Sequence, residues 1–313
     1  MIEVLCAGQL TVDILARPVD ELDFEDDTRL IEKIVIRNGG DGLNVACGLQ
    51  KLGHRVGFSG RIGDDLQGDF LTREIDQAGI DRRGLIRAPS HTTGTVLVVI
   101  NSLGERTFFY LGGANDQFSL EDIDRSQLEE AALVHVGGTY LLPSFDGDGA
   151  ARLFREARSA GKLTSMDVTW DTRGLWRRTI EPCFPYLSFF LPSYKEAAMI
   201  TDSRDPGEMA SLLQDWGVQN VVIKLGEEGC YVKPAGAGGF TVPAFRAQVV
   251  DTTGAGDSFV AGFLSGVLRE WDLGDCASLA CAVAALNIQC VGATEGMPTF
   301  ERADQFRKGA NHG

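Results

Sequence analysis

The chain of 313 residues lacks the short motifs that mark common metal and redox sites. Its seven cysteines contain no Cys-x-x-Cys pair, and its four histidines contain no His-Glu-x-x-His spacing. An odd number of scattered cysteines is typical of reduced thiols, which predicts a cytoplasmic protein. The absence of a ligand spacing among the histidines argues against a tight zinc site.

Long apolar runs and an excess of positive charge are also missing. No apolar run reaches the roughly 18 residues that a membrane-spanning helix needs. Residues 2–7 read as a strand with no basic region before it, so no secretion signal is expected. Asp and Glu number 44 against 29 for Lys and Arg, which gives a formal net charge of −15. Such a surface repels nucleic acid and anionic membranes, so neither is expected as a partner.

Two common nucleotide-binding motifs are absent as well. The only Gly-Lys pair, Gly161-Lys162, is followed by Leu163 and therefore does not complete a P-loop. No Gly-x-Gly-x-x-Gly follows the first expected strand. Both absences argue against a P-loop NTPase and against a Rossmann dehydrogenase.

What the chain does have is a regular alternation of short apolar segments and amphipathic helical segments. This pattern predicts a mostly parallel sheet with helices on both faces, in a single domain over residues 1–313. Expected strands are 4–8, 56–60, 132–136, 163–167, 189–191 and 221–224, and expected helices are 43–52, 68–78, 149–160, 195–201, 206–216, 258–269 and 273–288.

Two extended stretches, residues 29–37 and 93–111, break this alternation. The second reads as a hairpin that turns at residues 101–104. We expect them to form a small β-sheet that acts as a lid, with strands from about 13–38 and 90–113. The alternative is an extension of the edge of the main sheet.

The segment DTTGAGD at residues 251–257 places small residues between two acids. A strand is expected up to Val250 and a helix from residue 258, so the small residues would lie at a helix N-terminus. Unpaired N–H groups there bind anions, and small side chains let a phosphate reach them. Asp257 would then take a proton from an attacking hydroxyl. The alternative is an acid that only caps the helix.

With its neighbours, this segment resembles a known signature. DTTGAGDSFVAGF at 251–263, together with GGDGLNVA at 39–46 and GRIGDDLQG at 60–68, is similar to the motifs of the ribokinase/PfkB family of carbohydrate kinases. The resemblance implies a ribokinase-like, Rossmann-type three-layer α/β fold with a small β-sheet lid, and a homodimer formed through that lid. It also implies transfer of the γ-phosphate of ATP to a hydroxyl of a small sugar.

The same resemblance assigns roles to residues. Asp257 would be the catalytic base, and the N–H groups of Gly254, Ala255 and Gly256 would form the anion hole. Asp13 would accept hydrogen bonds from substrate hydroxyls, beside glycines that let a polyol approach the backbone. The set expected to bind substrate is Thr11, Asp13, Gly39, Gly40, Asn44 and Arg106.

The nucleotide contacts depart from the family pattern. Lys224 stands where Thr is expected in Thr-x-Gly-x-x-Gly, and Ser193 replaces the Asn of Asn-x-x-Glu. Glu196 is kept, which implies a place in the Mg²⁺ network, and Cys281 stands where relatives contact adenosine but reads equally well as packing. The set expected to bind ATP is Ser193, Lys224, Gly226, Gly229 and Cys281.

A monovalent cation, K⁺, is also implied by the resemblance. Asp251 and Thr253, with the backbone of Cys290 and Gly292, match its site in many relatives. Gly296 lacks the hydroxyl that ribokinase has there.

The substrate itself is left open between classes. Relatives that use ribose have Asn at the position of Thr11 and Lys at that of Asp41, so ribose is disfavoured. Arg106 could pair with an acid or phosphate of the substrate, as in 2-keto-3-deoxygluconate kinases or sugar-phosphate kinases, or be a solvated strand residue. The aromatics at 108–110 could instead stack on a nucleobase, in a nucleoside kinase. A sensor of sugar or nucleotide without catalysis is the third reading.

Overall fold

The computed structural model describes residues 1–21, 28, 30–103 and 105–309. A nine-stranded sheet forms its centre, in the order β13-β12-β11-β10-β9-β8-β1-β4-β5. The strands from β11 to β5 along this order run parallel, and β12 and β13 complete the sheet in antiparallel fashion. The strands are β1 (Val4–Gly8), β4 (Val56–Gly63), β5 (Asp81–Ala88), β8 (Leu133–Thr139), β9 (Leu163–Val168), β10 (Phe189–Phe190), β11 (Asn220–Lys224), β12 (Cys230–Lys233) and β13 (Phe240–Val242).

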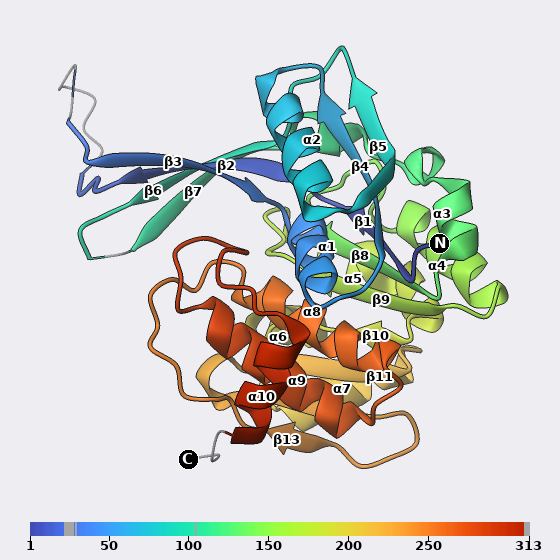
Figure 1. Cartoon of the computed structure of the whole chain (residues 1–313). Helices are drawn as coiled ribbons and strands as arrows, with labels where there is room; N and C mark the ends of the chain where they lie inside the picture. The colour runs from blue at the N-terminus through green and yellow to red at the C-terminus, as the bar shows by residue number, and fades with distance from the viewer. Residues whose placement is uncertain (22–27, 29, 104, 310–313) are drawn as a thin grey trace.

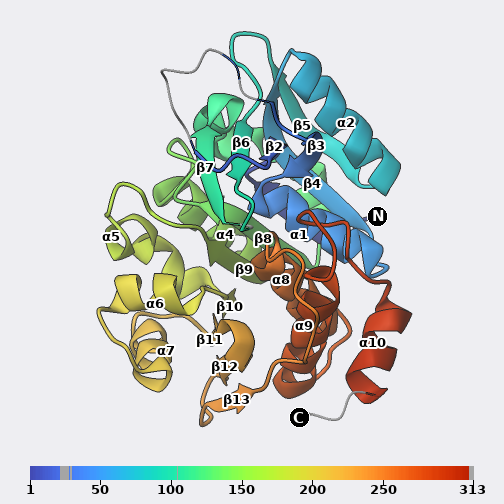
Figure 2. The same cartoon turned by 90° about the vertical axis from the view of Figure 1, so that its left-hand side faces the viewer.

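Helices cover both faces of this sheet, as the alternation predicted. Val4 and Cys6 of β1 belong to one apolar core, while Leu5 and Ala7 belong to the other, because successive strand residues point to opposite faces. In Figure 2, α8, α9 and α10 lie on one side of the strands and α5, α6 and α7 on the other. The first core involves α1 (Asp41–Lys51), α2 (Leu66–Ala78), α8 (Ala255–Leu268), α9 (Leu273–Asn287) and α10 (Phe300–Gly309); the second involves α3 (Arg125–Glu130), α4 (Asp148–Ser159), α5 (Arg177–Ile180), α6 (Tyr194–Thr201) and α7 (Pro206–Asp215).

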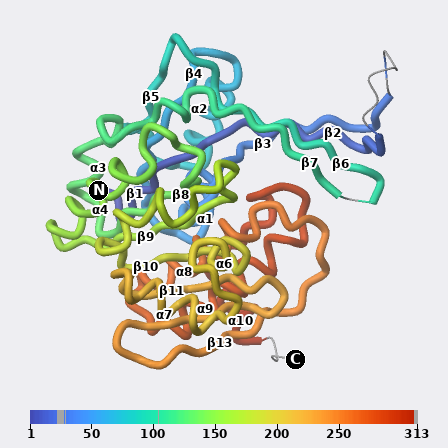
Figure 3. Tube along the Cα trace, turned by 180° about the vertical axis from the view of Figure 1, so that it is seen from behind, coloured from blue at the N-terminus to red at the C-terminus, as the bar shows by residue number. Residues whose placement is uncertain are grey.

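A second, small sheet of four strands projects from this body (Figures 1 and 3). Its order is β3-β2-β6-β7, so the alternative of an extended edge of the main sheet is wrong. β6 and β7 are the antiparallel hairpin expected over 93–111; Gly104 of its turn, and Arg29 at the start of the other stretch, lie outside the described residues. The strands are β2 (Thr11–Arg17), β3 (Lys33–Gly39), β6 (Thr95–Ile100) and β7 (Arg106–Leu111).

The two faces of the small sheet differ. Strand pairing places Asp13 opposite Arg37 and Val96, and Val96 opposite Tyr110, so these side chains share one face. Arg106 lies further along the same face, which we call the inner face of the small sheet; the opposite face is the outer face. The other face carries exposed apolar side chains, namely Ile34, Ile36, Leu97, Phe109 and Leu111.

The expected strand before the DTTGAGD segment is wrong. β13 ends at Val242, and residues 243–254 belong to no strand. The backbone N–H groups of Val250 and Asp251 instead donate to the carbonyl of Ile288, just after α9. α8 also begins three residues earlier than residue 258, at Ala255. Among the described residues, no helix is long and apolar enough to cross a membrane.

Candidate active site

Asp257 lies in the first turn of α8 and is only 9% exposed. Gly254 is the N-cap residue and no side-chain hydrogen bond caps this helix, so Asp257 is not the N-cap but the acid of the first turn. Its Oδ2 accepts a hydrogen bond of 2.8 Å from Nδ2 of Asn44, which lies 213 residues away in α1. The two glycine-rich motifs of the sequence therefore meet at one carboxylate.

Of the two glycines before Asp257, Gly254 is required by the local geometry. Gly254 has φ +69°, and a Cβ there would lie 2.3 Å from the carbonyl oxygen of Ala293. A Cβ on Gly256 would lie 3.4 Å from Nζ of Lys224, so a cation stands beside the start of the helix. The N–H of Ala255 donates to the carbonyl of Thr252 at 3.2 Å, so this one of the three predicted donors already has a protein partner.

A pocket of about 900 Å³ opens in front of this turn. It brings together the predicted Ser193, Glu196, Lys224, Gly226, Gly229, Ala255, Gly256, Asp257 and Cys281. Apolar side chains of the loop after β13 and of α9, namely Phe245, Ala247, Val249, Ala284, Ala285 and Ile288, line another part of it. Such a wall suits the flat apolar surface of an adenine ring.

Two cations, Lys224 and the exposed Arg246, line this pocket together with five acids, namely Asp41, Asp167, Glu196, Glu227 and Asp257. Burial raises the pKa of Asp257, and the charge of Lys224 and the hydrogen bond from Asn44 act against that rise. Burial raises the pKa of Asp167 to about 8, with Lys224 opposing and Asp257 and Glu196 contributing. The pKa of Asp41 is also raised, first by burial and then by the charges of Asp257 and Asp167. The lining of the pocket therefore carries more acids than cations.

Asp41 and Asp167 received no role from the motifs. Asp167 is the penultimate residue of β9, at the carboxyl edge of the sheet where ligands bind in α/β folds; the sequence predicts this position for it but no specific role. Its Oδ1 is buried without a hydrogen-bond partner among the described residues. No cluster of three or more His, Cys, Asp or Glu side chains in the described ranges could hold a metal by itself. A metal here would need phosphate oxygens as further ligands.

Glu196 has a structural partner in Ser193. The backbone N–H of Ser193 donates to Oε2 of Glu196 at 2.7 Å, and the N–H of Glu196 donates to Oγ of Ser193 at 3.4 Å. This reciprocal capping box begins α6. The Ser that replaces the family's Asn is therefore explained as a helix cap, while Glu196 still faces the pocket.

Residues of the small sheet fix the position of the Asp13 carboxylate. Oγ1 of Thr11 donates to its Oδ1 at 2.8 Å, and a Cβ on Gly39 would lie 2.2 Å from its carboxylate. Burial raises the pKa of Asp13 to about 6; the hydrogen bond from Thr11 lowers it, and the charge of Asp257 raises it. Gly40, with φ +89°, turns the chain from β3 into α1. The predicted sugar-side residues thus lie together at the base of the small sheet.

Arg106 and Cys281 are both engaged with other protein groups. The guanidinium of Arg106 donates to Asp251, Thr252 and Thr253, and the side chain is 21% exposed, so it is not a solvated strand residue. These partners include the two side chains predicted to hold K⁺. Cys281 is buried and in contact with the thiol of Cys230, and all seven cysteines are free of disulfides.

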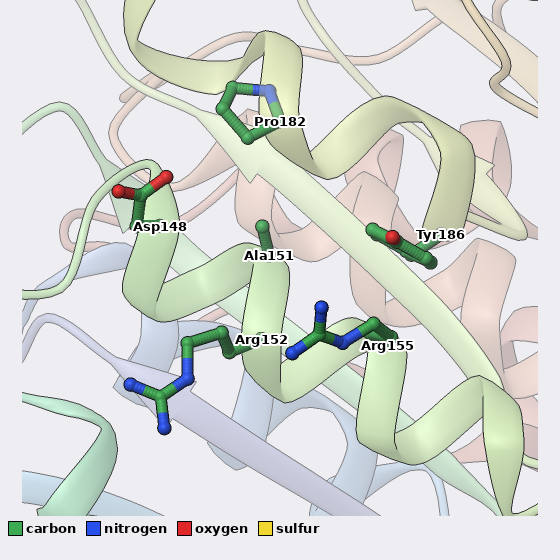
Figure 4. Close-up of a pocket in the computed structure, with 6 residues that line it drawn as sticks. All are labelled: Asp148, Ala151, Arg152, Arg155, Pro182 and Tyr186. Atoms are coloured by element: carbon green, nitrogen blue, oxygen red, sulfur yellow. The ribbon is translucent and has the colours of Figure 1, made fainter.

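A second hollow of about 390 Å³ lies between α4 and the turn at Glu181–Tyr186. Figure 4 shows its lining, in which the only charged side chains are Asp148, Arg152 and Arg155. It shares no residue with the pocket in front of Asp257. None of its residues belongs to the motifs of the sequence.

The model of the pfkB family of carbohydrate kinases matches residues 1–300. The chain belongs to this family. It is thus an ATP-dependent carbohydrate kinase, and the resemblance carried by its motifs is confirmed.

Named proteins agree with this assignment. This PfkB-family kinase is 30% identical over 274 residues to the 2-dehydro-3-deoxygluconokinase of Bacillus subtilis, covering 84% of each chain. It is 27% identical to the 5-dehydro-2-deoxygluconokinase of Clostridium perfringens, covering 98% of this chain and 93% of the relative. The solved ribokinase of Arabidopsis thaliana, complexed with ribose and ATP, has the same fold, with a TM-score of 0.85 at 24% identity over 98% of this chain and 99% of that one.

Proposed function

We propose that this kinase phosphorylates a hydroxyl of a sugar acid, with Asp257 as the general base. The observation that carries the proposal is the buried carboxylate of Asp257, which is held by Asn44 and stands beside Lys224 at the start of α8. A base needs an oxygen that is free to accept a proton. Asn44 occupies one carboxylate oxygen of Asp257, and the other would take the proton of the substrate.

Phosphate binding would depend on the groups around this carboxylate. Lys224 and the backbone N–H of Gly256 would hold the transferred phosphoryl group, because both residues line the pocket and present positive charge to it, whereas the predicted Gly254 is not part of the lining. Asp167 and Glu196 would hold Mg²⁺ together with the phosphates of ATP, and the bound ion would neutralise phosphate charge. The five acids of the pocket outnumber its two cations, Lys224 and Arg246, which supports such an ion.

The sugar would bind between the small sheet and the carboxyl edge of the main sheet. Asp13 and Tyr110 share the inner face of the small sheet, and Oη of Tyr110 donates to the carbonyl of Leu141 at 3.4 Å. Beside this contact, Nη2 of Arg173 donates to the carbonyl of Tyr140 at 3.2 Å. Nη2 of Arg173 lies 3.6 Å from Oδ2 of Asp146, but the side chain of Arg173 is 41% exposed, so the exposed part of its guanidinium could receive the carboxylate of an acid sugar. The two related gluconokinases support an acid substrate.

The experiment is an assay of ADP formation with three groups of acceptors: sugar acids, neutral monosaccharides and nucleosides. We expect the highest kcat/KM among the sugar acids. Arg173→Ala should raise KM for the acid and leave kcat much closer to wild type. Preference for a nucleoside would contradict the substrate class, and no ADP with any acceptor would support a sensor instead. Arg178→Ala, in the nearby α5, is the control for lost positive charge.

The small sheet would also act as the lid and as the dimer contact. Its outer face exposes Ile34, Ile36, Leu97, Phe109 and Leu111, and such a patch is typical of a protein interface. Light scattering should find a dimer in the wild type and a monomer in Ile36→Glu. Leu66→Glu, which changes a more exposed apolar residue of α2, is the matched control and should stay dimeric. A wild-type monomer would contradict this part of the proposal.

A further inference from the structure

The loop that leads into the anion hole is organised by Asp251. Oδ1 of Asp251 accepts hydrogen bonds from the N–H of Thr253 at 2.9 Å and from its Oγ1 at 2.7 Å. Oδ2 accepts from the N–H of Gly292 at 2.9 Å. Gly254, the N-cap of α8, packs against Ala293 in the same turn. Asp251 therefore joins the two chain segments whose contact fixes the position of Gly254.

A guanidinium already satisfies the side-chain oxygens of this loop. Nη1 of Arg106 donates to Oδ1 of Asp251 at 2.6 Å and also to Oγ1 of Thr253, and Nη2 donates to Oγ1 of Thr252 at 2.7 Å. The side chain of Asp251 is 9% exposed and that of Arg106 is 21% exposed. Burial alone would raise the pKa of Asp251. The hydrogen bonds from Thr253 and Gly292 and the charge of Arg106 keep this pKa below its usual range.

The residues present do not fit a monovalent cation at this loop. A K⁺ ion would need the same oxygens of Asp251 and Thr253 that Arg106 occupies, and it would meet the full positive charge of a guanidinium in direct contact. Arginine cannot lose its proton in a protein, so this charge is permanent. The expectation of a K⁺ site therefore conflicts with the side chain that the chain itself provides.

We infer that Arg106 supplies, from the small sheet, the positive charge that the loop before the anion hole would otherwise take from a monovalent cation. Arg106 is then a positioning residue: it acts on the transferred phosphoryl group through the loop at Asp251 and Gly254. A second arginine of the same face, Arg37, pairs with Glu295 on the neighbouring turn. The inference rests on the proposed role of the residues before Asp257 as the anion hole.

Two consequences follow from this inference. The wild-type enzyme should work without K⁺. Loss of the Arg106 side chain should expose a cluster of oxygens that a small cation can fill, as the carboxylate of Asp251 and the hydroxyls of Thr252 and Thr253 remain in place. A substrate-binding arginine would behave differently, since its loss would act mainly on KM for the sugar.

The test measures ADP formation by the full chain in tetramethylammonium chloride, with KCl or guanidinium chloride exchanged in at constant ionic strength. We expect the wild type to change by less than about twofold, and Arg106→Ala to lose about 10- to 100-fold in kcat, with a much smaller change in KM. K⁺ or guanidinium should restore part of this loss. Arg37→Ala is the matched control, and its activity should not respond to either cation.

A second measurement needs no substrate, so it separates this inference from the assignment of Asp257. KCl at low concentration should raise the melting temperature of Arg106→Ala above that in tetramethylammonium chloride, and should leave the wild type unchanged. Strong activation of the wild type by K⁺ would overturn the inference. So would full turnover by Arg106→Ala, a loss that no cation reduces, an effect confined to KM, or equal rescue of Arg37→Ala.

Discussion

The pocket in front of Asp257 and the inner face of the small sheet use charge in opposite ways. In the pocket, five acids face two cations, Lys224 and the exposed Arg246, and burial leaves the pKa values of Asp41, Asp167 and Asp257 raised. On the face of the small sheet that carries Asp13, Arg37 and Arg106 pair with Glu295 and Asp251, which are acids of loops in the main body. The pocket is thus left unbalanced until a ligand and its metal arrive, while the small sheet is balanced by the protein itself.

This difference indicates at which of the two regions a bound ligand adds favourable electrostatic free energy. Acids that are buried with too little positive charge raise the free energy of the empty site, and a bound cation recovers it. An arginine that is already paired with an acid contributes little further binding free energy to a new anion. It does, however, fix the position of the loop to which it is bonded relative to the small sheet. Substitutions in the pocket should therefore change the rate of the chemical step, and substitutions in the small sheet should change the positions of the loops and the stability of the protein.

The largest effect is expected at Asp257. Asp257→Asn keeps the shape and removes the proton acceptor, so kcat should fall by about 10³-fold or more. ATP binding, followed by calorimetry, should persist. Asp275→Asn is the matched control, because Asp275 is the acid in the first turn of α9 and is exposed near Arg307. Turnover of Asp257→Asn within a few-fold of wild type would show that the pocket holds no general base at this position.

Lys224 should come next. Lys224→Met removes the only ammonium of the pocket, and we expect kcat to fall by about 100-fold, as for loss of one donor at a developing anion. Because Lys224 lowers the pKa of Asp257, its loss should also move the acidic limb of the pH–rate profile to higher pH. Lys233→Met, on the neighbouring β12, controls for removal of charge. An acidic limb that stays in place would separate Lys224 from Asp257.

The sequence predicted the pocket better than the small sheet, for a physical reason. A glycine that avoids a clash, as Gly254 does, and an acid at a helix start leave a local pattern, and this pattern together with the second motif at 39–46 predicted Gly254, Gly256 and Asp257. The pairing of Arg106 with Asp251 joins positions 145 residues apart, and no local pattern encodes it. The segment before Asp251 was taken for a strand because it is apolar, whereas its backbone bonds to the end of α9.

The edge of the main sheet shows the same limit. β5, with the sequence DRRGLIRA, was not expected as a strand because three arginines interrupt its apolar pattern. As an edge strand it pairs on one side only, with β4, and its arginines bind acids on the surface, for example Arg83 with Asp81 and Glu130. Charged residues are common on edge strands because they prevent further pairing. The position of β5 at the edge of the sheet therefore determines that it is a strand, and its local composition does not.

The smallest effect is expected at Asp13, and it concerns stability. Burial raises the pKa of Asp13 to about 6, so the folded chain holds this proton more tightly than the unfolded chain. For such an acid, stability rises as pH falls from about 6 towards its unfolded pKa of about 4, and at pH 7 the charged, buried group costs free energy. Asp13→Asn removes that charge. It should therefore increase the free energy of unfolding by about 2 kcal/mol at pH 7 and by much less near pH 4.

A second acid of the same region provides the contrast. Asp20 is exposed, and the backbone and side chain of Ser102 donate to it, so its pKa is lowered and not raised. Asp20→Asn should therefore bring no gain in stability at pH 7. Denaturant unfolding at the two pH values measures both variants in the same way. If Asp13→Asn instead lowered the free energy of unfolding at pH 7, the protein itself would already stabilise the charged carboxylate of Asp13 in the empty site. The base of the small sheet would then resemble Arg106, whose charge is paired within the protein.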